Sequence, residues 1–120
     1  MILVVEDDPQ VSRLIALVLQ RNGYKAETVT DGNAALASAK ATRPQLVFAD
    51  LTIRGMNGAD LCVALKAEES TRDIPVIVLS GDRDIAEKAL SCGANDHLGK
   101  PFEFDDLIRL VKKYVKDQSS

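Results

Sequence analysis

Short apolar runs rich in β-branched residues alternate along this chain with longer stretches of helical periodicity. The first run, from Ile2 to Val5, is apolar at every position, which is typical of a parallel strand covered by helices on both faces. Further runs follow at residues 25–29, 46–49 and 76–79, and a shorter one lies near His97 and Leu98. Because parallel strands need helical crossovers that lie back on the sheet, this alternation predicts a doubly wound α/β fold with five parallel strands and five helices.

Residues that start and stop helices set the expected boundaries between these strands. Pro9 suits a helical first turn, and Asn22-Gly23 is a typical helix end. Asp31 before Gly32 caps an alanine-rich helix that we expect to run to about Thr42. The remaining helices are expected to carry Leu61 and Leu65, to run from about Ile85 to a stop at Gly93, and to present an apolar stripe from Leu107 to Val115.

The length and composition are ordinary for a single globular domain, which we expect to cover residues 1–120. The formal net charge of −3 argues against direct nucleic-acid binding, because that binding depends on an excess of Lys and Arg. No apolar run reaches the length of a membrane span and no export signal is visible, so a cytoplasmic location is expected. Cys62 and Cys92 form no paired motif and are interpreted as small buried hydrophobes.

Charged or nucleophilic groups follow four of the expected strands, at the edge where an open parallel sheet binds its ligands. They are Glu6 and Asp7 after the first strand, Asp50 after the third, Ser80 after the fourth and Lys100 after the fifth. Two carboxylates about 5 Å apart repel by about 3 kcal/mol at an effective dielectric constant of about 20. A hard cation such as Mg²⁺ removes that cost, and together with Lys100 it balances the charge of three carboxylates.

Nucleotide and flavin carriers are excluded by residue type. Neither a GxGxxG nor a GxxxxGK[ST] motif follows any expected strand, so the glycine-rich backbone cradle for phosphates is missing. The acidic residues after the first strand would also repel a nucleotide phosphate.

Four segments in this order resemble the receiver domains of bacterial two-component response regulators, and the resemblance covers essentially the whole chain. The segments are Val4-Val5-Glu6-Asp7, Asp50 with Gly58 eight residues on, Pro75 through Ser80-Gly81, and Gly93 through Lys100-Pro101-Phe102. The resemblance implies a flavodoxin-like strand order 2-1-3-4-5. It also implies a phosphorylation-dependent signalling switch, a phosphoacceptor domain that promotes its own phosphorylation and slow dephosphorylation and is not a conventional enzyme.

The resemblance assigns Asp50 as the phosphoacceptor and implies a bound Mg²⁺ or Mn²⁺. Asp7 and Asp50 would bind this ion directly, together with the main-chain carbonyl of Thr52. Glu6, in place of the commoner Asp, would act through metal-bound water. The implied phosphodonor is a sensor histidine kinase, a histidine phosphotransfer protein or a small acyl phosphate.

Three further residues would respond to the phosphoryl group. Lys100 would pair with a phosphoryl oxygen, and Ser80 would donate its hydroxyl to the group and move toward it. His97 occupies the position of a rotating aromatic side chain, often Tyr, in the family. The change would reach the surface of the fourth helix, fifth strand and fifth helix, where the family binds partners or a second copy, so a homodimer is plausible.

Several positions depart from the family pattern or vary within it. Ile53-Arg54 replaces the usual Met-Pro after the acceptor, and our hypothesis is that an exposed Arg54 modulates kinase recognition or phosphoryl lifetime. Thr52 and Asp82 stand at positions that influence autodephosphorylation in the family, although the sign of the Asp82 effect stays open. A histidine at 97 in place of Tyr leaves the coupling from Ser80 open and could make it pH-dependent.

Two other functions compete with the switch. A haloacid-dehalogenase-like phosphatase also uses an aspartyl nucleophile, but it needs a second Asp two residues later, where this chain has Thr52. A receiver-like interaction module that no longer accepts phosphate is the second alternative, and phosphorylation of Asp50 distinguishes it from a switch.

Overall fold

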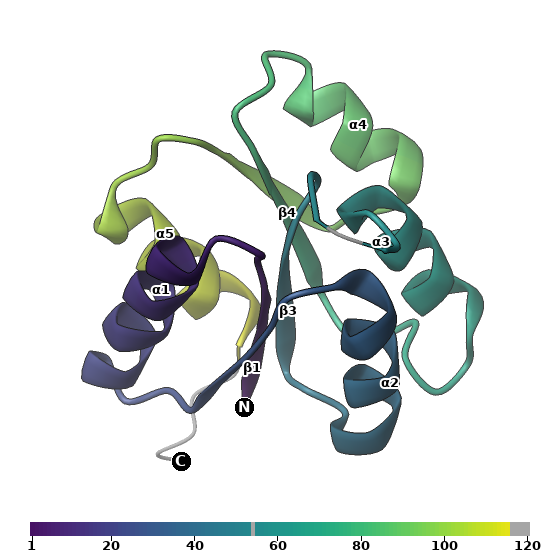
Figure 1. Cartoon of the computed structure of the whole chain (residues 1–120), viewed down its shortest axis with the longest axis horizontal. Helices are drawn as coiled ribbons and strands as arrows, with labels where there is room; N and C mark the ends of the chain where they lie inside the picture. The colour runs from purple at the N-terminus through teal and green to yellow at the C-terminus, as the bar shows by residue number, and fades with distance from the viewer. Residues whose placement is uncertain (54, 116–120) are drawn as a thin grey trace.

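Five parallel strands form one sheet at the centre of the molecule (Figure 1), in a computed structural model that describes residues 1–53 and 55–115. The strands are β1 (Ile2–Val5), β2 (Ala26–Val29), β3 (Leu46–Asp50), β4 (Val76–Ser80) and β5 (Asp96–Gly99). Their order in the sheet is β2-β1-β3-β4-β5, and every neighbouring pair is parallel. The predicted doubly wound fold and its flavodoxin-like strand order are therefore confirmed.

Five helices connect the strands and cover both faces of the sheet. They are α1 (Pro9–Arg21), α2 (Gly32–Thr42), α3 (Gly58–Ala67), α4 (Ile85–Cys92) and α5 (Phe104–Tyr114). Helices α1 and α5 lie on one face, whereas α2, α3 and α4 lie on the other (Figure 1). None of the helices among the described residues combines the length and apolarity that crossing a membrane requires.

The sheet separates two hydrophobic cores because successive side chains of a strand point to opposite faces. Leu3 and Val5 pack in the core under α2, α3 and α4, while Ile2 and Val4 pack in the core under α1 and α5. Strands β1, β3 and β4 are buried at every position, as the continuous apolar runs indicate. Both cysteines are buried, which agrees with their interpretation as core residues.

Local capping explains where the helices begin and end. The Asp8 carboxylate accepts hydrogen bonds from the backbone N–H groups of Gln10 (2.9 Å) and Val11 (3.5 Å) at the start of α1. Asp31 caps α2 in the same way through the N–H of Ala34 (2.8 Å). Gly93 ends α4 with a positive φ of 83°, a left-handed conformation that glycine adopts without strain.

Candidate functional site

The carboxyl ends of the strands bring the predicted site residues to one edge of the sheet. Asp50 and Ser80 are the last residues of β3 and β4, one residue further into the sheet than the apolar runs indicated. Asp50 pairs in register with Leu79, and the N–H of Lys100 donates to the Ser80 carbonyl (2.8 Å). Because sheet hydrogen bonds fix these backbones, the side chains project from a rigid frame.

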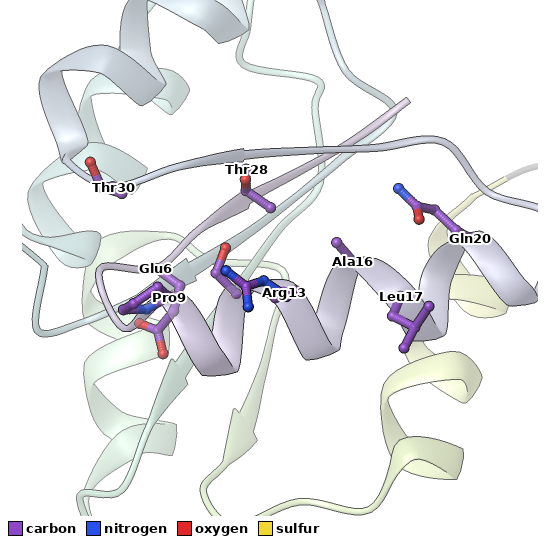
Figure 2. Close-up of a pocket in the computed structure, with 9 residues that line it drawn as sticks. Glu6, Pro9, Arg13, Ala16, Leu17, Gln20, Thr28 and Thr30 are labelled. Atoms are coloured by element: carbon purple, nitrogen blue, oxygen red, sulfur yellow. The ribbon is translucent and has the colours of Figure 1, made fainter.

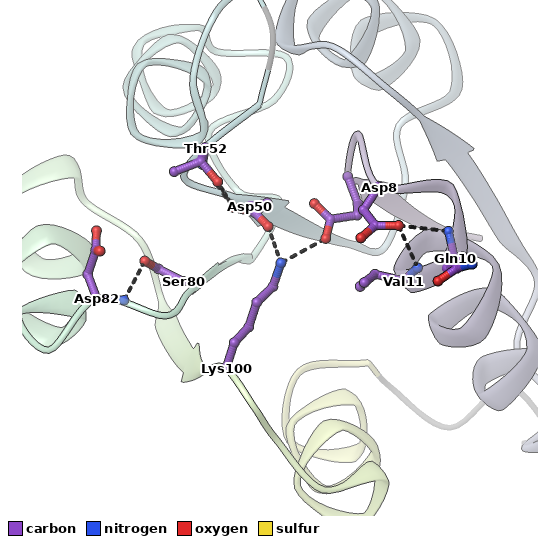
Figure 3. Close-up of polar contacts among 9 residues, drawn as sticks. Asp8, Gln10, Val11, Asp50, Thr52, Ser80, Asp82 and Lys100 are labelled. Atoms are coloured by element: carbon purple, nitrogen blue, oxygen red, sulfur yellow. Dashed lines mark hydrogen bonds and ion pairs between the residues drawn. The ribbon is translucent and has the colours of Figure 1, made fainter.

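Lys100 joins two buried carboxylates that come from different strands. Its ammonium group forms an ion pair with Glu6 (2.7 Å, Nζ to Oε1) and a short ion pair with Oδ2 of Asp50 (Figure 3). Only 1% of Glu6 and 3% of Asp50 is exposed, so both carboxyl groups depend on this contact for compensation of their charge. The three groups carry a net charge of −1 when both acids are ionised.

Burial and the charges of the neighbouring groups shift the pKa values of all three groups. Burial and the neighbouring Asp50 carboxylate raise the pKa of Glu6 from 4.5 to about 7. Burial alone would also raise the pKa of Asp50, but hydrogen bonds with Glu6, Lys100 and Thr52 lower it overall. Burial would lower the pKa of Lys100, yet the two carboxylates raise it. Asp50 is therefore the carboxylate that stays ionised near neutral pH.

The second oxygen of Asp50 is held by the residue two positions later. Oδ1 accepts hydrogen bonds from both the backbone N–H (2.8 Å) and the hydroxyl (2.9 Å) of Thr52. Sequence reasoning assigned Thr52 a carbonyl role at the metal and an influence on autodephosphorylation, but it missed this contact. The signal was present, because an Asp side chain commonly accepts from the N–H two residues on.

Two glycines let the backbone after β3 pack closely against its surroundings. A Cβ atom on Gly58 would lie 2.3 Å from the carbonyl oxygen of Asp50, and a Cβ on Gly32 would lie 1.9 Å from that of Met56. Real side chains do not tolerate such distances, so both positions require glycine. Gly58 thus packs directly against the peptide group of Asp50. This contact explains why a glycine stands eight residues after Asp50 in the sequence motif.

Ser80 lies beside this cluster, and its hydroxyl points toward Asp82 instead of Asp50 (Figure 3). Its Oγ accepts a hydrogen bond from the Asp82 N–H (3.0 Å). The carboxylate of Asp82 turns outward and pairs with Lys88 of α4 (2.7 Å). Hence the structure places Ser80 at the site, with Asp82 next to it.

The donor set fits a hard divalent cation. Glu6 and Asp50 offer carboxylate oxygens side by side, and their burial together with their mutual repulsion favours binding of a cation between them. Asp7 follows Glu6 directly and is half-buried. Within residues 1–53 and 55–115, no three His, Cys, Asp or Glu side chains already stand in a metal-binding arrangement, and Lys100 bridges the two buried acids instead.

The remaining two predicted residues lie away from this cluster or outside the described chain. His97 is half-buried on β5 and lines a groove of about 290 Å³ together with Arg109 and Lys113 of α5. Arg54 lies outside the described residues, as does the Ser119-Ser120 end of the chain.

A groove of about 500 Å³ between α1 and β2 touches the cluster only through Glu6 (Figure 2). Ser12 and Arg13 of α1 and Thr28 of β2 also line it. The groove is not lined by Asp50, Ser80 or Lys100, so it is separate from the position of the Asp50 carboxylate.

The doubly wound sheet with a buried acid pair and a lysine at its carboxyl edge is the arrangement that the resemblance to receiver domains implies. A family model described as "Response regulator receiver domain" matches residues 2–112. The chain therefore belongs to the response regulator receiver domains, as its sequence motifs indicated.

Two curated relatives illustrate the similarity. The DNA-binding response regulator MtrA of Mycolicibacterium smegmatis is 35% identical over 117 residues, which are 96% of this chain and 50% of MtrA. The nitrogen assimilation regulatory protein NtrX of Azorhizobium caulinodans is 37% identical over 119 residues, which cover 96% of this chain and 26% of NtrX. The chain thus spans half or less of the length of these relatives.

Two solved structures share the fold at 31% sequence identity. A putative response regulator from Chloroflexus aurantiacus superposes with a TM-score of 0.90, and 94% of each chain is covered. The receiver domain of sensor histidine kinase PA1611 from Pseudomonas aeruginosa has a TM-score of 0.87 with the same coverage. That structure is described with a magnesium ion coordinated in its active-site cleft.

Proposed function

We propose that Asp50 accepts a phosphoryl group from a histidine kinase, a histidine phosphotransfer protein or a small acyl phosphate, and that the chain acts as a phosphorylation-dependent switch. The observation that carries this proposal is the environment of Asp50. Its carboxylate is buried, kept ionised by Lys100 and Thr52, and attached to a backbone that the sheet and Gly58 hold in place. A positioned, ionised carboxylate is what nucleophilic attack on phosphorus needs.

The transfer forms one bond and breaks another. A carboxylate oxygen of Asp50 attacks the phosphorus in line, and the bond from phosphorus to the donor's imidazole nitrogen or acyl oxygen breaks, leaving its electron pair with the donor. Lys100 then exchanges a carboxylate partner for a phosphoryl oxygen, while Thr52 keeps Asp50 oriented. Asp7, Asp50 and the Thr52 carbonyl would hold Mg²⁺ or Mn²⁺, with Glu6 acting through water. The bound ion neutralises phosphoryl charge.

The new acyl phosphate adds charge and acceptor oxygens beside Ser80, whose hydroxyl can donate to them. His97 would then carry the rearrangement to the surface of α4, β5 and α5. This shifts a population of conformations instead of building a new fold. That surface is where we expect output partners or a second copy of the chain to bind, whereas the net charge of −3 does not favour nucleic acid.

A protein phosphodonor must bring its histidine to Asp50, so its docking surface has to border the site. An apolar groove of about 440 Å³ does so beside Lys100, between α1 and the start of α5. Leu14 and Phe104 line it and are 46% and 44% exposed, so the groove presents apolar surface next to Lys100. This surface supports a protein donor. Because kinases make the phosphohistidine from ATP, we place the chain in the cytoplasm.

Incubation with acetyl phosphate and Mg²⁺, followed by intact-mass measurement, tests the proposal. We expect a mass gain of one phosphoryl group in the wild type, none in Asp50→Asn, and an unchanged gain in the control Asp60→Asn, because Asp60 is an exposed residue of α3. No gain in the wild type would favour an interaction module that no longer accepts phosphate. Steady turnover of a phosphate monoester would favour the phosphatase. A slow loss of the added mass would report autodephosphorylation, which Thr52, Asp82 and Arg54 are proposed to modulate.

A further inference from the structure

In the loop between β4 and α4, one residue, Asp82, contacts both neighbouring elements. The Asp82 N–H donates to the Ser80 hydroxyl oxygen (3.0 Å), and the Asp82 carboxylate pairs with the Lys88 ammonium (2.7 Å). Lys88 also approaches Asp84 of the same loop (3.5 Å). Asp82 therefore connects the switch hydroxyl directly to a side chain on α4.

The hydrogen bond from Asp82 keeps Ser80 in the orientation seen here. Ser80 is only 3% exposed, and its hydroxyl points away from Asp50 (Figure 3). To reach a phosphoryl group on Asp50, the hydroxyl must turn, and the Asp82 N–H then loses its acceptor unless the loop follows. Whatever stabilises the present position of Asp82 therefore opposes that rotation.

The ion pair with Lys88 provides this stabilisation. Both side chains are about half exposed, with 44% for Lys88 and 47% for Asp82, so salt in solution weakens the attraction. The contact lowers the pKa of Asp82 and raises that of Lys88, as expected when the two charges stabilise each other. Because Lys88 lies on α4, this ion pair also connects the loop to the surface of α4, β5 and α5, where we propose that output partners bind.

We propose that Lys88 is a positioning residue of the switch, which holds Asp82, and through it the Ser80 hydroxyl, in the unphosphorylated arrangement. This inference rests on the proposed phosphoacceptor function. It assigns a regulatory role to Lys88, which is not one of the proposed site residues. Loss of the Lys88 charge shifts the population toward the arrangement that binds a phosphoryl group, so affinity for that group rises.

Affinity for beryllofluoride, a phosphoryl mimic that binds an aspartate carboxylate, measures this shift without a kinase. With Mg²⁺ present, we expect Lys88→Ala to bind beryllofluoride roughly two- to fivefold more tightly than the wild type, the range expected for loss of an exposed ion pair. Lys88→Arg should restore wild-type affinity because it keeps the charge. Lys40→Ala is the matched control, since Lys40 of α2 forms a similarly exposed ion pair with Glu68 (2.8 Å) outside this loop.

A double-mutant cycle separates positioning from a general effect on folding. In an Asp82→Asn background, Lys88→Ala should change beryllofluoride affinity much less than in the wild type, because the Asp82 charge is gone and only the longer contact with Asp84 remains. Amide hydrogen exchange of Asp82 should be faster in Lys88→Ala than in the wild type and unchanged in Lys40→Ala. High salt should raise the beryllofluoride affinity of the wild type toward that of Lys88→Ala, because salt weakens the exposed ion pair.

The outcomes distinguish this proposal from the proposed function. If the wild type binds beryllofluoride and Asp50→Asn does not, the phosphoacceptor site stands. Unchanged or weaker binding by Lys88→Ala, or an equal change in the Asp82→Asn background, then overturns the role of Lys88 alone. If the wild type does not bind beryllofluoride, the proposed function itself fails.

Discussion

Replacing Glu6 by Gln should stabilise the metal-free protein, and the gain should grow with pH. In the folded protein the pKa of Glu6 is raised from 4.5 to about 7, so the folded state binds the proton more tightly than the unfolded state. Protonated Glu6 therefore contributes its full amount to the stability of the wild type below pH 4.5, and this contribution is lost as the pH rises through about 7. Glutamine imitates the neutral acid at every pH and does not suffer this loss.

The magnitude follows from the two pKa values. The difference between 4.5 and about 7 corresponds to about 3 kcal/mol, at about 1.36 kcal/mol per pH unit. No correction for solvent is needed, because Glu6 is 1% exposed. Glu6→Gln should therefore be more stable than the wild type by about 3 kcal/mol at pH 8 but by less than about 1 kcal/mol at pH 5.

Urea unfolding in EDTA at both pH values measures these free energies. Glu69→Gln is a suitable control because Glu69 is an exposed carboxylate between α3 and β4, and its replacement should change little. Mg²⁺ should stabilise the wild type more than Glu6→Gln, since the variant lacks one acidic group of the site. Equal stability of wild type and Glu6→Gln at pH 8 would refute the claim that the buried, ionised Glu6 carboxylate destabilises the metal-free fold.

Two further predictions concern the acceptor's support and the donor's docking surface. Gly58→Ala places a methyl group against the Asp50 backbone, so it should lower the free energy of unfolding in urea by about 2 kcal/mol and slow phosphorylation by acetyl phosphate. Gly99→Ala, which has open space at its Cβ, should change neither quantity. Equal behaviour of the two variants would contradict the packing argument. Leu14→Asp should reduce transfer from autophosphorylated histidine kinases yet leave labelling by acetyl phosphate unchanged. Val63→Asp, at a similarly exposed apolar position on α3, should affect neither reaction. A loss of both reactions in Leu14→Asp would point to damage of the site itself.

The sequence was sufficient for the fold and for the edge at which the site forms. Continuous apolar runs identify strands buried on both faces, and the residue after each run falls at a predictable place in a parallel sheet. Glu6, Asp50, Ser80 and Lys100 were found by this rule, and the structure brings them to one edge.

Side-chain partners within the site could not be read from the sequence. Lys100 was expected at the site, but its simultaneous contact with Glu6 and Asp50 depends on rotamers and on the register of β5. The pairing of Asp82 with Lys88 depends on how the loop enters α4, which no periodicity encodes. The need for glycine at position 32 arises from a contact with Met56, a residue 24 positions away, so only the folded backbone reveals it.

The contact between Glu6 and Lys100 joins residues 94 positions apart, and that between Asp50 and Lys100 joins residues 50 positions apart. During synthesis Glu6 and Asp50 emerge first, and the lysine that compensates their charge follows only after β5. A nascent chain that ends before β5 thus contains Asp50 without the ammonium group that keeps it ionised in the folded protein. The buried acid pair can therefore be compensated only after the last strand of the sheet has been synthesised.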